Sequence, residues 1–202
     1  MRPIKRVIIG SRGSLLALAQ SSLALERLQK LYPGIEFSLQ KITTKGDRLT
    51  DLPLPSFGGK GIFIKELETA LLEREIDLAV HSFKDLPSEM EPELEITAVL
   101  EREDPRDVLV SRKGLKLAEL PAGSRLGTGS PRRKAQISSF RPDLHVLDMR
   151  GNVDTRLRKI EEGLYDGAIM AAAGLIRLGR QNIITEYLSP EICTPPVGQG
   201  AI

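Results

Sequence analysis

Residues 7–28, VIIGSRGSLLALAQSSLALERL, hold the pattern that decides the expected fold. The apolar run at 7–9 ends at Gly10, and leucines then recur at helical spacing from Leu15 to Leu28. A short apolar run, a glycine-containing loop and an amphipathic segment predict a strand, a loop and a helix. Such units, repeated along a chain, build an α/β protein.

The same alternation continues toward the middle of the chain. Alternating apolar residues predict a strand over 35–42, and apolar spacing predicts a helix from 63 to 71. Short apolar runs predict buried strands at 76–80 and near 96–99. This part of the chain therefore has the element order of an α/β domain.

A charged, proline-containing segment at 101–107 interrupts the apolar pattern. We place a domain boundary there, which gives a first domain at 1–101 and a second at 102–196, with a return to the first at about 197–202. The second domain repeats the α/β order. It predicts strands at 108–110, into Gly127, at 145–147 and at 168–172, and helices opened by Pro131 and by Asn152. The apolar tail at 195–202 also has the pattern of a strand.

The composition narrows the classes of function. The chain has 202 residues, of which 41% are hydrophobic, and 29 basic against 27 acidic residues give a net charge of only +2. With 4% aromatic residues, it offers neither a basic stripe nor a stacking surface for nucleic acid. The apolar run near the N-terminus is too short for a signal peptide or a membrane span, so we expect a cytoplasmic protein without membrane contact. The single Cys193 and two histidines predict neither a disulfide nor a metal site.

Three loops between a predicted strand and a predicted helix carry arginines. They are SRGS at 11–14, GTGSPRR at 127–133 and RGNVDTR at 150–156. Glycines let the backbone approach a ligand, and free N–H groups of a helix N-terminus beside guanidinium groups suit a carboxylate. Each loop taken alone also fits a capped helix with solvated arginines, but a set at one sheet edge indicates a polyanionic ligand.

The loop HSFKDLP at 81–87 follows a predicted buried strand, so Lys84 and Asp85 are expected over the same sheet edge. A carboxylate among cations is a candidate acid or base, whereas the alternative is a surface ion pair or a turn-forming Asp. For His81 as well, the alternative to a catalytic role is a structural one. GGKG at 58–61 lacks the spacing of a phosphate-binding loop and predicts a glycine-hinged mobile loop instead.

Seven segments, taken in order, resemble the porphobilinogen deaminases (hydroxymethylbilane synthases) along the whole chain. They are SRGSLLALAQ, GGKGIFIKELE, LAVHSFKDLP, EREDPRDVLVS, GTGSPRR, RGNVDTR and PPVGQGA. The resemblance implies two α/β domains like type II periplasmic binding proteins, each a mixed, mainly parallel sheet flanked by helices, with the active-site cleft between them. It also implies a third α+β domain, absent from this chain, whose cysteine anchors a dipyrromethane cofactor. Cys193 precedes that position, so we expect no attachment there and an inactive chain without the third domain.

The activity implied by the resemblance is the head-to-tail condensation of four porphobilinogens, with loss of ammonia, into the linear tetrapyrrole hydroxymethylbilane. Asp85 matches the family's catalytic aspartate and would stabilise positive charge at the pyrrole nitrogens. The residues implied to hold the cofactor are Ser82, Lys84, Asp85, Thr128, Ser130, Arg132 and Arg133. Those implied to hold the substrate and growing chain are Arg12, Ser14, Gln20, Arg150, Arg156 and Arg177.

The mobile loop matched by the resemblance includes Ser56, Gly58, Gly59 and Lys60, and Ser56 stands where some members of the family have a lysine. The family-like oligomeric state is a monomer. A rival function is a non-catalytic two-domain module that binds anions, because a binding-protein-like fold does not by itself dictate an enzyme. A nucleic-acid-binding protein would use the same arginines, but the small net charge disfavours it.

Overall fold

The computed structural model describes residues 4–43 and 64–202. The chain forms two compact units: Met1–Glu101 with Ala201–Ile202, and Arg102–Gly200. Residues 197–200 thus fall in the second unit. Within the described residues each unit contains one β-sheet with helices packed on it, so the predicted α/β class is confirmed.

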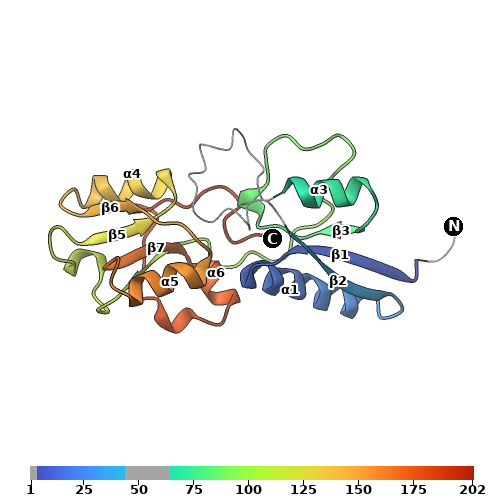
Figure 1. Ribbon diagram of the computed structural model, residues 1–202, viewed down its shortest axis with the longest axis horizontal. Helices are drawn as coiled ribbons and strands as arrows, with labels where there is room; N and C mark the ends of the chain where they lie inside the picture. Colours follow the sequence, from blue (N-terminus) through green and yellow to red (C-terminus); the bar gives the residue numbers. More distant parts are fainter. Residues whose placement is uncertain (1–3, 44–63) are drawn as a thin grey trace. The chain divides into compact units, whose positions relative to one another are not determined.

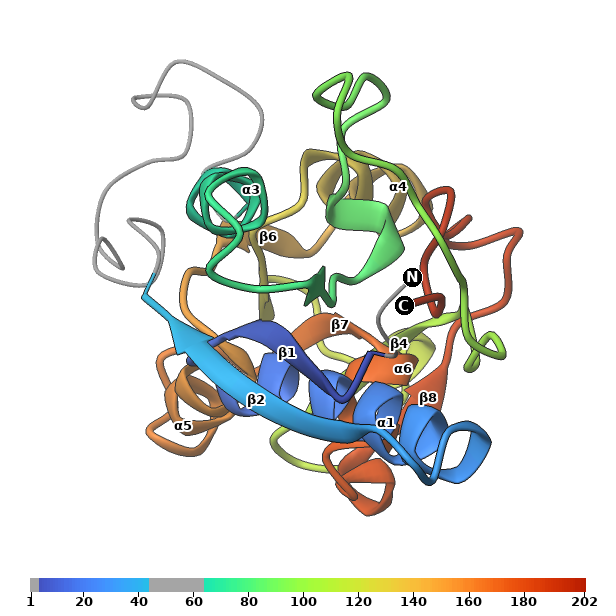
Figure 2. The ribbon, with the colours of Figure 1, turned by 90° about the vertical axis from the view of Figure 1, so that its right-hand side faces the viewer.

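The sheet of the first unit is parallel throughout. Its order is β2 (Glu36–Ile42), β1 (Arg6–Arg12) and β3 (Leu78–Ala79). Helix α1 (Leu15–Leu31) packs on β1 and β2, as Figure 2 shows, and α3 (Lys65–Leu72) packs near β3. Because β1 and β3 are parallel neighbours, the loops that follow them emerge at the same edge of the sheet.

The sheet of the second unit is mixed. Its order is β6 (His145–Asp148), β5 (Arg125–Thr128), β7 (Gly167–Ala171), β4 (Asp107–Ser111) and β8 (Glu186–Tyr187). The strands β6, β5 and β7 are parallel, and β4 runs antiparallel to β7 and β8. The sheet is therefore mainly parallel where the candidate loops leave it.

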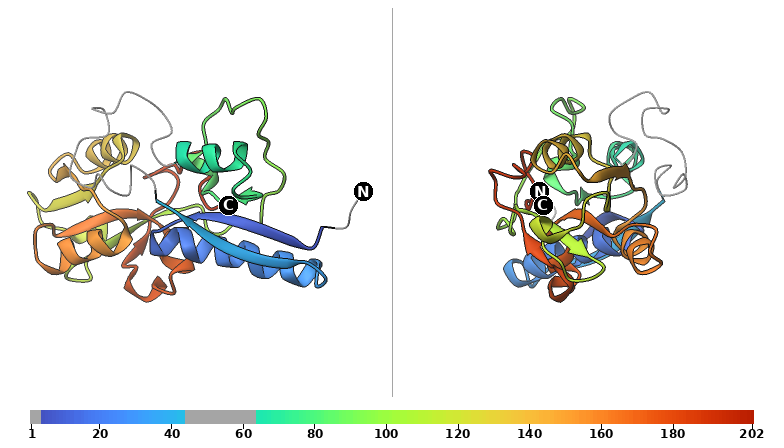
Figure 3. Two further views of the ribbon diagram at one scale, coloured as in Figure 1. Left: turned by 45° about the vertical axis from the view of Figure 1, so that its right-hand side comes forward. Right: turned by 90° about the vertical axis from the view of Figure 1, so that its left-hand side faces the viewer.

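Three helices follow the parallel strands of this sheet. They are α4 (Pro131–Phe140) after β5, α5 (Val153–Glu161) after β6 and α6 (Ala172–Arg177) after β7. Helix α4 covers one face and α5 the other (Figure 3). Strand β4 alternates between two cores: Leu109 packs in one apolar cluster, and Val108 and Val110 pack in the other. Short 3₁₀ turns are η2 (Phe83–Asp85), η3 (Leu117–Glu119) and η4 (Gln181–Ile183).

Two sequence predictions are wrong. Residues 96–99 form no strand, and Ile96 and Val99 are 46% and 50% exposed. The tail 195–202 consists of turns and irregular backbone instead of a strand. An apolar run becomes a strand only where a neighbouring strand accepts its backbone hydrogen bonds, and neither run has such a neighbour among the described residues.

Two further features concern the described residues only. None of their helices combines the length and apolar character that crossing a membrane requires. Across 4–43 and 64–202, no three or more His, Cys, Asp or Glu side chains gather into a group that could hold a metal ion.

Candidate functional site

At the edge of the first sheet, the end of β1 meets the loop that follows β3. Arg12 is the last residue of β1, and Ser14 caps α1 by accepting a hydrogen bond of 3.3 Å from the backbone N of Ala17. Nε2 of buried Gln20 donates a hydrogen bond of 2.8 Å to Oγ of Ser82. The structure thus joins α1 to the loop that carries the candidate acid.

Asp85 ends the 3₁₀ turn η2 and is solvent-exposed. Its backbone N donates a hydrogen bond of 2.9 Å to the carbonyl of Ser82, and the backbone N of Phe83 donates one of 3.0 Å to the carbonyl of Ala201. Although Asp85 is exposed, protein atoms near its carboxyl group partly displace water from it, and this desolvation raises the pKa of Asp85, while the charges of Lys84 and Arg12 oppose that rise. A carboxyl group with a raised pKa beside two cations suits proton transfer or the stabilisation of developing positive charge.

His81 stands next to this turn. Burial, reinforced by the positive charge of Arg12, lowers the pKa of His81 to about 4. The imidazole is therefore neutral at pH 7 and adds no cation to the edge of the first sheet.

At the edge of the second sheet, the loop between β5 and α4 lies close against its neighbours. Thr128 is 1% exposed, and its Oγ1 accepts a hydrogen bond of 3.2 Å from the backbone N of Ser130. Ser130 caps α4 by accepting a hydrogen bond of 3.4 Å from the backbone N of Arg133. A β-carbon on Gly129 would stand 2.9 Å from the carbonyl oxygen of Met149, so only glycine fits this close approach.

Arg156, on α5, brings a cation to the same loop. Its Nη2 would lie 3.8 Å from a β-carbon built on Gly129, and its Nε donates a hydrogen bond of 2.8 Å to the carbonyl of Gly151. Burial, together with repulsion from Arg133 and Arg150, lowers the pKa of Arg156 to about 10. Arg156 remains charged at pH 7, and positive charges crowd this edge, which favours an anion there.

Arg150 precedes the cap of α5, where Asn152 accepts a hydrogen bond of 3.0 Å from the backbone N of Thr155. No hydrogen bond or ion pair joins its side chain to another of the described residues. Its backbone carbonyl accepts a hydrogen bond of 3.1 Å from Nζ of Lys159. The guanidinium group of Arg150 therefore remains able to bind a ligand.

Arg132 and Arg133 both bind the carboxylate of Asp107. Nη2 of Arg133 lies 2.7 Å from Oδ1, and Nη2 of Arg132 lies 2.6 Å from Oδ2. The Arg133 side chain is 7% exposed and that of Arg132 is 27% exposed. Arg132 can therefore meet a ligand with its exposed part, whereas Arg133 is nearly enclosed and is held by Asp107.

Cys193 belongs to the same cluster. It is 1% exposed, and its Sγ donates a hydrogen bond of 3.2 Å to Oδ2 of Asp107. Burial, aided by the Asp107 carboxylate, raises the pKa of the Cys193 thiol to about 11. The thiol is protonated and enclosed, which makes it a poor nucleophile.

Arg177 ends α6, and its Nη2 donates a hydrogen bond of 2.6 Å to the carbonyl of Gly200. Its Nε is buried and has no hydrogen-bond partner within the described part of the chain. Burial lowers the pKa of Arg177, and the charge of Glu103 opposes that shift. An unpaired buried donor of this kind fits an oxygen atom of a ligand.

Candidate residues thus lie together at one edge of each sheet. The first holds Arg12, Ser14, Gln20, Ser82, Lys84 and Asp85, and the second holds Thr128, Ser130, Arg132, Arg133, Arg150 and Arg156. Arg177 stands at the far end of its helix, on Gly200. The expected mobile-loop residues Ser56, Gly58, Gly59 and Lys60 lie outside the described residues.

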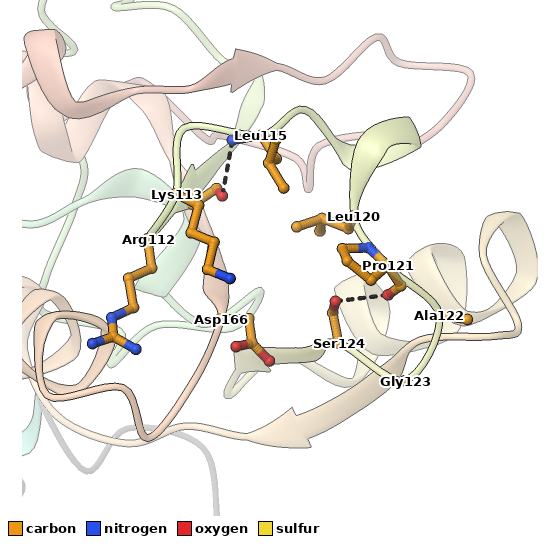
Figure 4. Close-up of a pocket in the computed structure, with 10 residues that line it drawn as sticks. Arg112, Lys113, Leu115, Leu120, Pro121, Ala122, Gly123, Ser124 and Asp166 are labelled. Atoms are coloured by element: carbon orange, nitrogen blue, oxygen red, sulfur yellow. Dashed lines mark hydrogen bonds between the residues drawn. The ribbon is translucent and has the colours of Figure 1, made fainter.

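A cavity of about 290 Å³ lies in the second unit, away from these loops. Figure 4 shows Arg112, Lys113 and Asp166 around it, with Leu115 and Leu120 on its apolar side. Its residues follow β4 and precede β5 and β7, so it opens at the opposite edge of the sheet from Thr128. The cavity is separate from the candidate site.

Sequence reasoning missed two residues of the site. Asp107 stood in the charged segment that we interpreted as a domain boundary, and Gln199 stood in the tail motif without a role. Both are buried, at 0% and 1% exposure, and Nε2 of Gln199 donates a hydrogen bond of 2.9 Å to Oδ1 of Asp107. The sequence does contain a signal for Asp107, because this carboxylate directly precedes the apolar run of a predicted buried strand. A carboxylate at such a position needs a buried partner.

Comparisons with known proteins agree with one another. Residues 7–202 match the family model described as porphobilinogen deaminase, dipyromethane cofactor binding domain. The porphobilinogen deaminase of Syntrophobacter fumaroxidans (strain DSM 10017 / MPOB) is 53% identical over 198 residues, which cover 98% of this chain and 64% of that protein. That of Bacillus subtilis (strain 168) is 50% identical over 203 residues, 100% of this chain and 64% of that protein. The chain therefore spans about 64% of the length of these curated relatives.

Among solved structures, the probable amino-acid ABC transporter extracellular-binding protein YtmK from Bacillus subtilis matches with a TM-score of 0.47 and 12% identity. The match covers 93% of this chain and 79% of that chain. The fold class rests on the strand orders given above.

Proposed function

Because the chain belongs to the porphobilinogen deaminase family, we propose that it acts in the condensation of four porphobilinogens, with loss of ammonia, into hydroxymethylbilane. The observation that carries the proposal is the crowding of positive charge near Gly129, where burial, together with repulsion from Arg133 and Arg150, lowers the pKa of Arg156 to about 10. Each porphobilinogen brings an acetate and a propionate. Planar guanidinium groups bind carboxylates with two parallel hydrogen bonds, so this edge suits a chain that gains carboxylates at each step.

Asp85 is the proposed catalytic residue. When the C–N bond of the aminomethyl group breaks, its electrons leave with ammonia and positive charge spreads to the pyrrole nitrogen. The Asp85 carboxylate would accept the N–H hydrogen bond and stabilise that charge. The α-carbon of a second pyrrole then forms the new C–C bond, and the proton lost from that carbon passes to Asp85 or to water. The raised pKa of Asp85 supports its role in this exchange.

Substrate contacts are proposed within each unit separately. Arg12, Ser14 and Gln20 would orient substrate in the first unit, and Arg150, Arg156 and Arg177 would bind carboxylates in the second. The unpaired buried Nε of Arg177 and the guanidinium group of Arg150 support these assignments.

The matched family model names a dipyromethane cofactor, and the residues present fit such a group. It carries acidic side chains, and the N-terminal turn of α4 offers Ser130, Arg132 and the charge of Arg133, with Thr128 beside them. In the first unit Ser82, Lys84 and Asp85 would hold it. When bound, the dipyrromethane supplies the pyrrole carbon on which the first substrate is added. Cys193 is not a proposed attachment site, because its thiol is enclosed and protonated.

The test is porphobilinogen consumption and uroporphyrin formation by the protein at the full length of its relatives, with the 202-residue chain beside it. Turnover by the longer protein supports the proposal. Binding of porphobilinogen without turnover in either protein would favour a non-catalytic anion-binding module instead. We also propose that the protein is a cytoplasmic monomer. Size-exclusion chromatography tests its oligomeric state.

A further inference from the structure

Asp107 is the centre of a buried polar cluster in the second unit. Its Oδ1 accepts hydrogen bonds from Nε and Nη2 of Arg133, at 3.0 Å and 2.7 Å, and from Nε2 of Gln199 at 2.9 Å. Its Oδ2 accepts hydrogen bonds from Arg132 at 2.6 Å and from Cys193 at 3.2 Å. Four side chains thus converge on one carboxylate that water does not reach.

The cluster leaves both arginines with little freedom. Nη1 of Arg133 donates a hydrogen bond of 3.2 Å to the carbonyl of Ile169, and Nη1 of Arg132 binds the carbonyl of Thr194. Gln199 is held in turn, because its Nε2 also donates a hydrogen bond of 2.7 Å to the carbonyl of Pro105. Since a planar guanidinium group bound through two nitrogens has one orientation, the cluster fixes the first turn of α4 against β4.

The charges of the cluster do not cancel. One carboxylate faces two guanidinium groups. The positive charge of Arg133 also repels that of Arg156. Burial raises the pKa of Asp107, but attraction to Arg133 and the hydrogen bonds from Arg133, Gln199 and Arg132 outweigh it and hold the pKa below its ordinary value. Asp107 is therefore ionised at pH 7. The cluster of one carboxylate and two guanidinium groups keeps a net charge of one positive unit beside the loop between β5 and α4.

We infer that Asp107 is a positioning residue of the anion site: it orients Arg132 and Arg133 at the start of α4 and moderates the repulsion that Arg133 exerts on Arg156. The inference rests on the proposed function for the identity of the ligand. A buried ion pair often adds little net stability compared with apolar side chains, so orientation is the more specific consequence of this cluster. Nothing in the cluster requires Asp107 to touch the ligand.

The first test is Asp107→Asn, which keeps the size of the side chain and removes its charge. The matched control is Asp104→Asn, because Asp104 also binds an arginine, Arg106 at 2.6 Å, but on the surface of the same unit. Calorimetry gives the Kd of porphobilinogen, and thermal unfolding gives Tm. We expect a Kd at least about tenfold higher for Asp107→Asn and unchanged for the control, since the loss of one hydrogen bond between a misoriented arginine and a charged ligand corresponds to roughly ten- to hundredfold in Kd.

A second variant separates charge from orientation. Arg133→Lys keeps the positive charge but loses the fork that binds Asp107, so we expect a comparable rise in Kd. If Asp107→Asn fails to fold, Arg133→Lys alone decides. Wild-type affinity in folded Asp107→Asn, or in Arg133→Lys, overturns the inference.

A measurement without ligand keeps the two proposals apart. Nitrogen-15 relaxation of the arginine Nε–H groups reports whether Arg132 and Arg133 are rigid, and we expect them to be rigid in the wild type and in Asp104→Asn but mobile in Asp107→Asn. Equal rigidity in all three proteins overturns the positioning role whatever the ligand is. If the rigidity changes as expected but porphobilinogen does not bind the wild type, the proposed function fails and the positioning of the arginines stands.

Discussion

Glu103 and Gly200, far apart in the sequence, lie against each other in the second unit. The backbone N of Glu103 donates a hydrogen bond of 3.0 Å to the carbonyl of Gly200, and a β-carbon on Gly200 would stand 2.2 Å from the carbonyl oxygen of Glu103. The φ angle of Gly200 is +93°, which side chains other than glycine rarely adopt. This contact holds the end of the second unit in place.

Gly200→Ala should therefore destabilise the chain. Backbone strain alone costs about 1–3 kcal/mol, and the contact with Glu103 adds to it. Thermal unfolding checks this, with Gly34→Ala as the control, because a β-carbon on Gly34 has open space around it. Equal Tm values for the two variants would contradict the role of Gly200.

Asp85→Asn should nearly abolish turnover of the full-length protein. Removal of a group that transfers protons or stabilises charge costs about 10²–10⁴-fold in rate. The fold should survive, because Asp85 is exposed and contributes little to the core. Steady-state kinetics and circular dichroism check both points, with Asp143→Asn as the control, since the Asp143 side chain is 40% exposed, pairs with Arg141 at 2.7 Å and has no proposed role in the site. Near-normal turnover would remove Asp85 from the mechanism.

The raised pKa of Asp85 predicts how pH affects both stability and activity. A raised pKa in the folded state contributes stability below the ordinary pKa of Asp, and that stability is lost as pH rises through the folded pKa. Asp85→Asn should therefore unfold at an equal or higher temperature at pH 7. If the carboxylate is the active form, kcat/KM should fall as pH drops through the raised pKa.

Lys84→Met should move the fall of kcat/KM at low pH to higher pH. The reason is that the charge of Lys84 opposes the rise of the Asp85 pKa, so its removal raises that pKa further. Carbon-13 NMR of the Asp85 carboxyl group measures the same shift directly. A shift to lower pH would contradict the assigned electrostatics.

Arg156→Gln should weaken binding of porphobilinogen. Loss of a hydrogen bond to a charged group costs about 1.5–3 kcal/mol, which corresponds to roughly ten- to hundredfold in Kd. The remaining affinity should depend less on salt concentration. Arg158→Gln is the control, because Arg158 lies on the same helix with its side chain 66% exposed. Equal losses of affinity in both variants would show that Arg156 contributes no more to binding than an exposed arginine of the same helix.

Cys193 should resist alkylation. At pH 8 a thiol with a pKa of about 11 is almost entirely protonated, so we expect a rate on the order of 100-fold below that of an exposed thiol. Mass spectrometry after iodoacetamide treatment measures it, with the unfolded chain as the reference. Rapid labelling of the folded chain would contradict the enclosed, protonated thiol.

Local sequence patterns predicted most strands and helices correctly. The cap residues Ser14, Ser130 and Asn152 begin α1, α4 and α5, because their side chains bind backbone N–H groups a few residues away. The run at 96–99 was misjudged because its apolar residues say nothing about a pairing strand. The roles of the candidate site residues remain predictions.

By itself the sequence determined the α/β class, the helix starts and the loops rich in arginine and glycine, since each depends on residues within a few positions of one another. Only the tertiary structure decided that Asp107 binds Arg132, Arg133, Gln199 and Cys193, and that Gln20 reaches Ser82. These contacts join segments distant in the chain. Their existence depends on strand order and side-chain packing, which no local pattern records, because a buried charge finds its partners only when the whole sheet has formed.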